Sequence, residues 1–337
     1  MNQPRLPFSQ LATAIGSMPQ TDPQEAVSMV LRELPELPAW PQLFHRSPLE
    51  HMAPQFTDGI TDATVEGDVV TLAGSPGEHD MPELREERAA GFFAFLKSDL
   101  TGVTGLKGQV TGPLTFSHLV QMADGGSADE NVRIARRLAH LLGRLAEWQE
   151  NQLRRHTRNT LILLDEPLLA ESLADRRLGP SICLDLIATT LMWIKGARGL
   201  HTCAPPNWKL LLNLPLQVLS FDAYSYGETT EDAAKGIRGF LVNGGFIAWG
   251  IVPATQAILD GENVDSLVER LAHLWGRLID LDVPGALLER QCMFTPSCGL
   301  AGLTPQGAEK ALRFTREIAR RVQQGAVLDK HGVGGQP

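Results

Sequence analysis

The sequence predicts a single (β/α)8 barrel, a TIM-barrel α/β fold in which eight parallel strands alternate with helices. Three observations support this prediction. Short apolar runs alternate with segments of helical periodicity along most of the 337 residues. Several runs are rich in Val, Ile and Leu without polar alternation, which is typical of parallel strands buried on both faces. No G-x-G-x-x-G motif follows a strand, which argues against a doubly wound nucleotide-binding sheet.

The eight apolar runs define the expected strands. They lie at residues 11–16, 38–43, 105–110, 160–164, 199–203, 217–221, 245–251 and 291–297. Helix signals separate many of them. Asp22 and Pro23 supply an N-cap and a first-turn proline for the first helix. Ser127 and Glu130 have the spacing of a capping box and predict the start of another helix.

The domain organisation follows from the same pattern. We expect one barrel domain over residues 1–325, because no linker divides the chain. Residues 57–75 (TDGITDATVEGDVVTLAGS) have the pattern of a β-hairpin inserted in a loop. Residues 326–337 are expected to form a flexible tail.

Composition and charge exclude several classes of partner. The formal net charge is −9, which argues against nucleic acid and against an anionic membrane surface. The chain has no run of 18 apolar residues and no apolar segment near its start, so we expect neither a membrane span nor a signal peptide. A cytoplasmic location is the resulting expectation.

The first chemical signal is His201-Thr-Cys203, at the end of the fifth expected strand. Alternate side chains of a strand point to the same face, so the imidazole and the thiol point the same way. Both are good zinc ligands. The pair alone is a weak signal, since the four cysteines, Cys183 and Cys292 in particular, can also be small buried hydrophobic residues.

Further candidate residues follow other strands. Cys298 ends the eighth strand, and Asp222 ends the sixth, where it could equally be a helix cap. Asp165 and Glu166 follow four apolar residues of the fourth strand, where a solvated loop carboxylate is the alternative. All lie at carboxyl ends of expected strands, the rim at which active sites of such barrels form.

Taken in order, the motifs resemble the catalytic domain of cobalamin-independent methionine synthase. The resemblance extends to the superfamily shared with uroporphyrinogen decarboxylase and corrinoid-linked thiol methyltransferases. The matching segments, which run from the first strand to the last, are 15–21 (IGSMPQT), 111–115 (TGPLT), 165–167 (DEP), 201–203 (HTC) and 297–299 (SCG).

This resemblance implies a zinc ion held by His201, Cys203, Cys298 and a carboxylate. The family's carboxylate is a glutamate; the nearest counterpart here is Asp222, with Glu228 as the alternative. These three non-carboxylate ligands, together with Asp165, are the expected catalytic residues.

The resemblance also implies homocysteine as the substrate. Ile15 and Ser17 of the first turn would bind it, as would Asp165 and Glu166, with Asp165 on its amino group. The product would be methionine.

Two departures bear on the methyl donor. The chain is long enough for one barrel, whereas the full enzyme has two barrel-like halves. Residues 249–255 (WGIVPAT) lack the family's histidine that helps to protonate the folate leaving group. The chain therefore resembles the short "core" methionine synthases. We expect the donor to be methylcobalamin or a corrinoid protein, and less so methyltetrahydrofolate.

Two alternatives stay open. The acceptor could be another thiol such as coenzyme M. The chain could also be a non-catalytic zinc- or corrinoid-binding barrel, whose structural metal would have four permanent ligands. The decarboxylase function is disfavoured, because that branch's arginine-rich N-terminal signature is missing.

Overall fold

The computed structural model describes residues 6–175 and 178–327. Its centre is a seven-stranded, wholly parallel sheet in the order β1-β10-β9-β8-β7-β6-β4. Most of the expected tail, residues 328–337, lies outside the described residues. The strands of the sheet are β1 (Leu11–Ala12), β4 (Leu106–Thr111), β6 (Thr160–Asp165), β7 (Ala197–Thr202), β8 (Val218–Phe221), β9 (Phe246–Val252) and β10 (Cys292–Pro296).

The expected strand at residues 38–43 is the main difference from the predicted eightfold pattern. This segment makes only two isolated parallel bridges, Ser17 with Gln42 and Ala39 with Lys107, so it lies between the chain after β1 and β4. Pro38 and Pro41 explain why no regular ladder forms, because proline has no backbone N–H to donate. The fold is an α/β fold with a curled seven-stranded sheet.

Side-chain hydrogen bonds, and not a ladder of backbone hydrogen bonds, fix the position of the 38–43 segment. The indole of Trp40 donates to Oε1 of Gln149 at 3.1 Å, and the amide of Gln149 donates to the carbonyl of Gln109 at 3.0 Å. The Gln109 amide returns to the carbonyl of Trp40 at 2.9 Å. This closed ring of three hydrogen bonds ties the segment both to β4 and to the long helix behind it.

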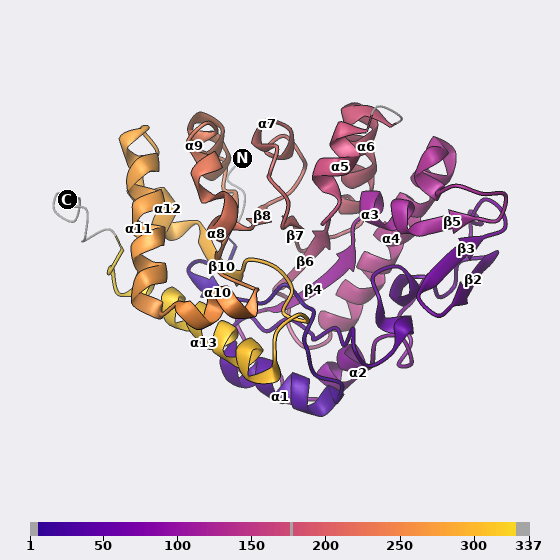
Figure 1. Cartoon of the computed structure of the whole chain (residues 1–337), viewed down its shortest axis with the longest axis horizontal. Helices are drawn as coiled ribbons and strands as arrows, with labels where there is room; N and C mark the ends of the chain where they lie inside the picture. The colour runs from indigo at the N-terminus through magenta and orange to yellow at the C-terminus, as the bar shows by residue number, and fades with distance from the viewer. Residues whose placement is uncertain (1–5, 176–177, 328–337) are drawn as a thin grey trace.

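Helices surround the curled sheet, in a row along the upper part and another along the lower part of Figure 1. They are α1 (Pro23–Glu33), α2 (Ala90–Leu96), α3 (Pro113–Leu119), α4 (Val132–Leu153), α5 (Leu169–Ala174), α6 (Gly179–Leu191), α7 (Trp208–Leu211), α8 (Ala223–Tyr226), α9 (Ala234–Val242), α10 (Gln256–Gly261), α11 (Val264–Asp280), α12 (Gly285–Arg290) and α13 (Pro305–Gln323).

Two helix starts test the capping signals. Asp22 caps α1 by accepting from the backbone of Glu25 at 2.8 Å, as predicted. The capping box at Ser127 was wrong. Residues Ala128–Glu130 form a single 3-10 turn, and α4 begins at Val132 with Asn131 as its cap. The hydroxyl of Ser127 donates to Asp129 instead, so it is not available to cap the backbone of Glu130.

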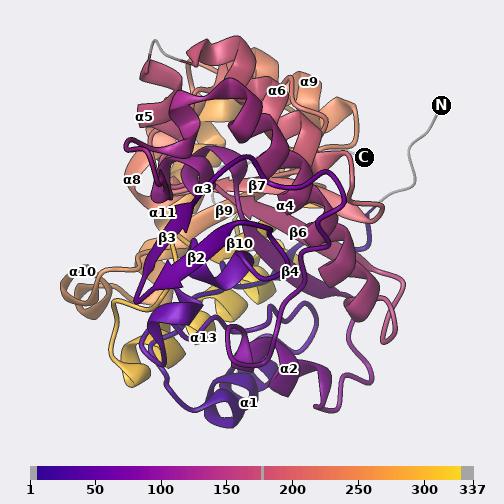
Figure 2. The same ribbon diagram turned by 90° about the vertical axis from the view of Figure 1, so that its right-hand side faces the viewer.

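A second, smaller sheet stands beside the main one. Within residues 57–75, β2 (Ala63–Glu66) and β3 (Val69–Leu72) pair antiparallel. The strand β5 (Val120–Met122) adds to β3 in parallel. This sheet lies at one side of the molecule in Figure 1 and faces the viewer in Figure 2.

The two faces of the main sheet have different compositions. Outward-facing strand residues join a large cluster with the helices. The inner face carries a smaller apolar cluster: Phe8, Leu11, Leu37, Leu161, Leu163, Ala197, Val218, Phe246, Ala248 and Met293. On strands β4 and β10, Lys107, Gln109 and Thr295 are buried polar residues of the same inner face. Polar groups therefore accompany the apolar layer inside the curl.

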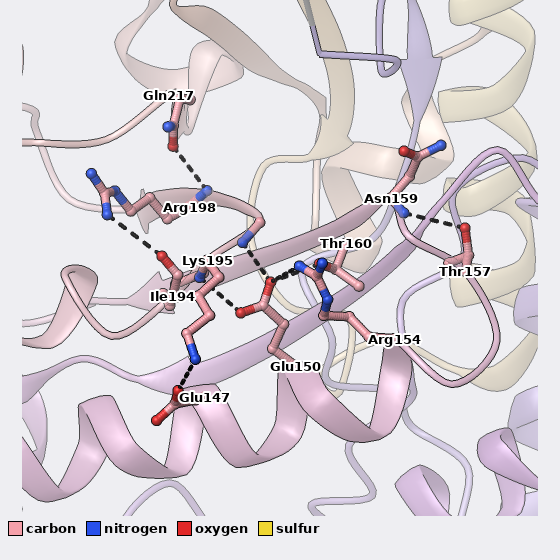
Figure 3. Close-up of polar contacts among 11 residues, drawn as sticks. Glu147, Glu150, Arg154, Thr157, Asn159, Thr160, Ile194, Lys195, Arg198 and Gln217 are labelled. Carbon is pink, nitrogen blue, oxygen red and sulfur yellow. Dashed lines mark hydrogen bonds and ion pairs between the residues drawn. The ribbon is translucent and has the colours of Figure 1, made fainter. Parts of the chain in front are cut away.

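The amino ends of β6 and β7 are joined through one buried carboxylate (Figure 3). Glu150 of α4 is fully buried and accepts from the Thr160 hydroxyl at 2.8 Å. It also accepts from the backbone N–H groups of Lys195 at 2.8 Å and Gly196 at 2.6 Å. Hydrogen bonds to Glu150 thus join β6 and β7 at their amino ends, which lie opposite the carboxyl ends that carry the motif residues.

Across residues 6–175 and 178–327, no helix combines the length and the apolar character that crossing a bilayer requires.

Candidate metal centre

The His-x-Cys pair lies at the carboxyl end of β7, as its position in the sequence predicts. His201 is the second-last residue of the strand and is 2% exposed, and half-buried Cys203 follows the strand directly. In the parallel register, His201 lies beside Asp165 of β6 and Ser220 of β8. The imidazole is therefore held between two neighbouring strands of the sheet.

Cys298 reaches the same place from the far end of the chain. It lies two residues after β10, and its neighbour Gly299 packs against Ser17, since a Cβ at Gly299 would come within 2.0 Å of the Ser17 hydroxyl. Ligand atoms of His201, Cys203 and Cys298 all lie within 4.8 Å of one another. The structure thus brings together three side chains that are separated by up to 97 positions in the sequence.

The chemistry of these atoms fits a zinc ion. Nδ1 of His201 lies 2.9 Å from the hydroxyl of Ser220, which orients the ring, and its buried Nε2 has no hydrogen-bond partner among the described residues. Ligating imidazoles characteristically bond an outer partner through the second nitrogen in this way. One nitrogen and two sulfurs form a donor set that zinc prefers.

The thiols of Cys203 and Cys298 shift each other's pKa in opposite directions. A hydrogen bond with Cys298 lowers the pKa of Cys203, and the neighbouring His201 lowers it further. The pKa of Cys298 is raised by the same hydrogen bond and by burial, because a second thiolate so close to the first would be repelled. A cation at this point would relieve that repulsion and allow both sulfurs to be thiolates.

The two candidates for a carboxylate ligand lie outside this group. Asp222 follows β8 and is 8% exposed, but its side chain accepts from the backbone of Ser225 at 2.9 Å and caps α8. Glu228 is exposed on the 3-10 turn Gly227–Thr230. The contacts of Asp222 are thus those of a helix cap, which was the alternative to a metal ligand. A fourth ligand from either Asp222 or Glu228 stays a prediction.

Asp165 is the last residue of β6 and is 9% exposed. Its Oδ1 is buried without a hydrogen-bond partner among the described residues. Burial raises the pKa of Asp165 to about 6, while the charges of Lys107 and His201 act in the opposite direction. A buried carboxylate oxygen without a donor costs free energy, so this group is well suited to bind a cationic donor that enters from outside.

Glu166, the next residue, faces elsewhere. Its carboxylate accepts from the backbone of Leu114 at 2.8 Å and from the backbone and hydroxyl of Thr115 at 2.9 and 2.7 Å. It thereby caps the start of α3, and a Cβ at Gly112 would meet it at 2.3 Å. Burial raises the pKa of Glu166 to about 7. The TGP segment (111–113) and the DEP segment (165–167) thus meet, and a substrate contact by Glu166 stays a prediction.

The turn after β1 lies beside the metal ligands. Ser17 accepts from the backbone N–H of Leu300 at 2.8 Å through its carbonyl, which joins the turn to the loop after Cys298. The carbonyl of Ile15 accepts from the ammonium group of Lys107 at 2.6 Å. Both residues line a cavity, and their side chains are available to a ligand there.

This cavity, of about 280 Å³, joins the predicted residues into one site. It is lined by Ile15, Ser17, Gln42, Phe44, Glu50, Met52, Thr111, Asp165, Pro167, His201, Cys203, Cys298, Gly299, Ala301 and Gly302. Neither Asp222 nor Glu166 lines it. A small apolar-walled cleft with a few convergent polar groups is typical of small-molecule sites.

Sequence reasoning missed two charged residues here. Glu50 lines the cavity and pairs with Arg46 at 2.6 Å, but it lies in a short 3-10 turn, Pro48–Glu50, without a recognisable motif. Lys107 is fully buried inside the sheet, and a charged residue within the predicted buried strand at 105–110 was the signal that could have found it.

The fold and the site together define an α/β protein with a candidate zinc centre at the carboxyl edge of a curled parallel sheet. No protein-family model matches the chain, and neither does any curated protein sequence.

Solved structures do resemble it. A B12-independent methionine synthase from Shewanella sp. W3-18-1, in complex with selenomethionine, is 13% identical with a TM-score of 0.66 and covers 95% of this chain and 99% of its own. A Listeria monocytogenes protein, provisionally described as a vitamin-B12 independent methionine synthase, is 12% identical with a TM-score of 0.56, covering 90% and 86%.

A methyltransferase from Methanosarcina mazei is 13% identical with a TM-score of 0.50, and the match covers 92% of this chain and 94% of that one. These are the kinds of protein that the motifs resemble, so the resemblance is confirmed at the level of the fold. The likeness in fold extends over nearly the whole chain.

Proposed function

We propose that this protein is a zinc-dependent methyltransferase that transfers a methyl group to the thiol of homocysteine and forms methionine. One observation carries the proposal: His201, Cys203 and Cys298 converge within 4.8 Å at a cavity that Asp165 also lines. One cleft thus holds a set of metal-ligating side chains, which suits a substrate thiol, and a carboxylate without a partner, which suits a substrate amine.

His201, Cys203 and Cys298 would hold the zinc, and Asp222 remains our proposed source of a carboxylate ligand. Bound zinc would supply the acidity that converts a substrate thiol, with an ordinary pKa near 8.5, into a thiolate at neutral pH. The chain's own contribution is to hold the ligands rigidly. Ser220 fixes the plane of the His201 imidazole, and the coupled thiols provide negative charge.

Asp165 would bind the substrate's ammonium group. Its Oδ1 lacks a donor, and an ammonium group would satisfy it with a charge-assisted hydrogen bond. Ile15 and Ser17, which line the same cavity, would position the remainder of the amino acid. The Shewanella protein, described as a complex with selenomethionine, is compatible with an amino-acid ligand of this shape.

The proposed donor is a methylated corrinoid, either free methylcobalamin or a corrinoid protein. In the transfer a sulfur–carbon bond forms and the cobalt–carbon bond breaks, with its electron pair remaining on cobalt, while the thiol proton leaves to solvent. No proton is needed by the leaving group, and the loop Pro253-Ala254-Thr255 after β9 offers no histidine to supply one. The methionine synthase neighbours are described as B12-independent, so methyltetrahydrofolate must be tested beside the corrinoid.

The experiment is a methyl-transfer assay with zinc-loaded protein. Homocysteine is offered with methylcobalamin or with methyltetrahydrofolate, and coenzyme M replaces homocysteine in a parallel reaction. We expect methionine from homocysteine with methylcobalamin. Asp165→Asn should weaken homocysteine binding more than it slows the saturated rate, because a neutral amide loses the charge that attracts the ammonium group.

Zinc-edge X-ray absorption separates this function from a purely structural zinc barrel. Addition of homocysteine should add one sulfur to the zinc coordination shell. A four-ligand shell that homocysteine leaves unchanged, together with no methionine from either donor, would contradict the proposed function.

A further inference from the structure

Lys107 occupies an unusual place in the fold. It is the second residue of β4, on the inner face of the sheet, and is 0% exposed. Removing an ammonium group from water is costly unless hydrogen bonds and an opposite charge compensate it. An ammonium group buried at such a position needs specific contacts. The contacts of Lys107 lead to the residues around the candidate metal centre.

The contacts of Lys107 reach the turn that lines the cavity. Its ammonium group donates to the carbonyl of Ile15 at 2.6 Å and to Oε1 of Gln109 at 3.0 Å. Ile15 begins the Ile15-Gly16-Ser17 turn, whose two other residues bond the backbone of Gln42 and Leu300. Lys107 thus holds the amino end of this turn from inside the sheet, without lining the cavity itself.

The charge of Lys107 also acts on the site. Burial lowers its pKa to about 8, and Asp165 raises it, so the two groups stabilise each other's ionised forms. The two residues lie on the neighbouring strands β4 and β6, with Lys107 opposite Leu161. Among the described residues, Oδ1 of Asp165 has no hydrogen-bond partner, so Lys107 does not neutralise it by direct contact. A positive charge behind the cavity wall therefore compensates Asp165 and leaves its free oxygen to a ligand.

We propose that Lys107 is a positioning residue for the thiol substrate: it holds the Ile15–Ser17 turn in its binding geometry and supplies the internal counter-charge of Asp165. The identity of the substrate rests on the proposed function, whereas the role of Lys107 in the turn does not. The residue touches neither the reacting atoms nor the metal ligands.

The first test needs no substrate. Hydrogen–deuterium exchange is compared between the wild type and Lys107→Met, which keeps the length of the side chain and removes its charge. We expect exchange within residues 11–20 to accelerate about ten-fold or more, with the rest of the chain unchanged. Unchanged exchange in this segment would overturn the proposal, and so would acceleration spread over the whole protein, which would indicate a merely structural role.

Thr295→Val is the matched control. Thr295 is a buried inner-face residue of β10 whose hydroxyl has no hydrogen-bond partner among the described residues. Its replacement changes the polarity of the same interior without removing a hydrogen bond to the turn. It should leave exchange within residues 11–20 as it is in the wild type.

The second test uses kinetics with homocysteine and with 4-mercaptobutanoate, which lacks the amino group. Lys107→Met should raise the KM for homocysteine about ten-fold, leave kcat within about three-fold and keep stoichiometric zinc. The des-amino thiol should be affected less. Equal losses for both thiols, or a fall in kcat at constant KM, would refute the role of Lys107. An inactive wild type would refute the proposed function, and the exchange experiment would still decide on Lys107.

Discussion

The buried carboxylate of Glu150 allows a quantitative test of the structure. Glu150→Leu replaces the carboxylate by an apolar side chain of similar size and so removes the acceptor of three hydrogen bonds. The hydroxyl of Thr160 can turn to another partner, whereas the backbone N–H groups of Lys195 and Gly196 cannot. Each unsatisfied N–H costs about 1–3 kcal/mol when fully buried, so two part-buried groups should lower the free energy of unfolding by about 2–6 kcal/mol, toward the lower end of that range.

The assay is urea unfolding of the metal-free protein, followed by circular dichroism, with the midpoint and slope measured for each variant. Glu147→Gln is the matched control, one helical turn earlier. Its carboxylate pairs with the ammonium group of Lys195 at 2.5 Å, but that ammonium group is exposed, so solvent screens the pair and the midpoint should stay close to that of the wild type (Figure 3). Equal midpoints for Glu150→Leu and Glu147→Gln would refute the reasoning.

Three further predictions concern the site and its supports. Cys298→Ala should lose stoichiometric zinc by metal analysis, while Cys183→Ala, in a buried cysteine of α6 outside the site, should retain it; full zinc in the first variant would contradict the ligand assignment. Because burial lowers the pKa of Lys107 to about 8, the unfolded chain binds the extra proton between pH 8 and the ordinary value of 10.5. As the pH rises from about 8 to 10.5, the free energy of unfolding of the wild type should therefore increase by about 3 kcal/mol relative to that of Lys107→Met. A difference between the two proteins that does not change with pH would contradict this prediction. Gly112→Ala would place a Cβ 2.3 Å from the Glu166 carboxyl, and should lower thermal stability by about 1–3 kcal/mol, to be checked by calorimetry.

The parts of the fold that could be predicted are those governed by local patterns. Continuous apolar runs marked β6 and β9 because parallel strands buried on both faces tolerate few polar residues. The failures occurred where local signals compete. The run at residues 38–43 is apolar, but its prolines prevent regular pairing. Ser127 has the spacing of a capping box, but its hydroxyl bonds Asp129.

The candidate site shows the same division. His201 and Cys203 could be paired from the sequence because strand alternation fixes their common direction. Asp222 could be placed at a strand end, but the choice between capping a helix and binding a metal depends on the chain's path over the next few residues. Glu50 carried no usable signal, since it lies in a short 3-10 turn and reaches the cavity only through the tertiary fold.

The sequence by itself determined the α/β class, the order of most strands and the types of ligand atom available, because these depend on periodicity and on the chemistry of single side chains. Only the tertiary structure decided that the thiols of Cys203 and Cys298 face each other, that Glu166 caps a helix, and that Lys107 bonds the carbonyl of Ile15. These relations join residues distant in the chain, and they are set by the curvature and register of the sheet, which no local pattern encodes.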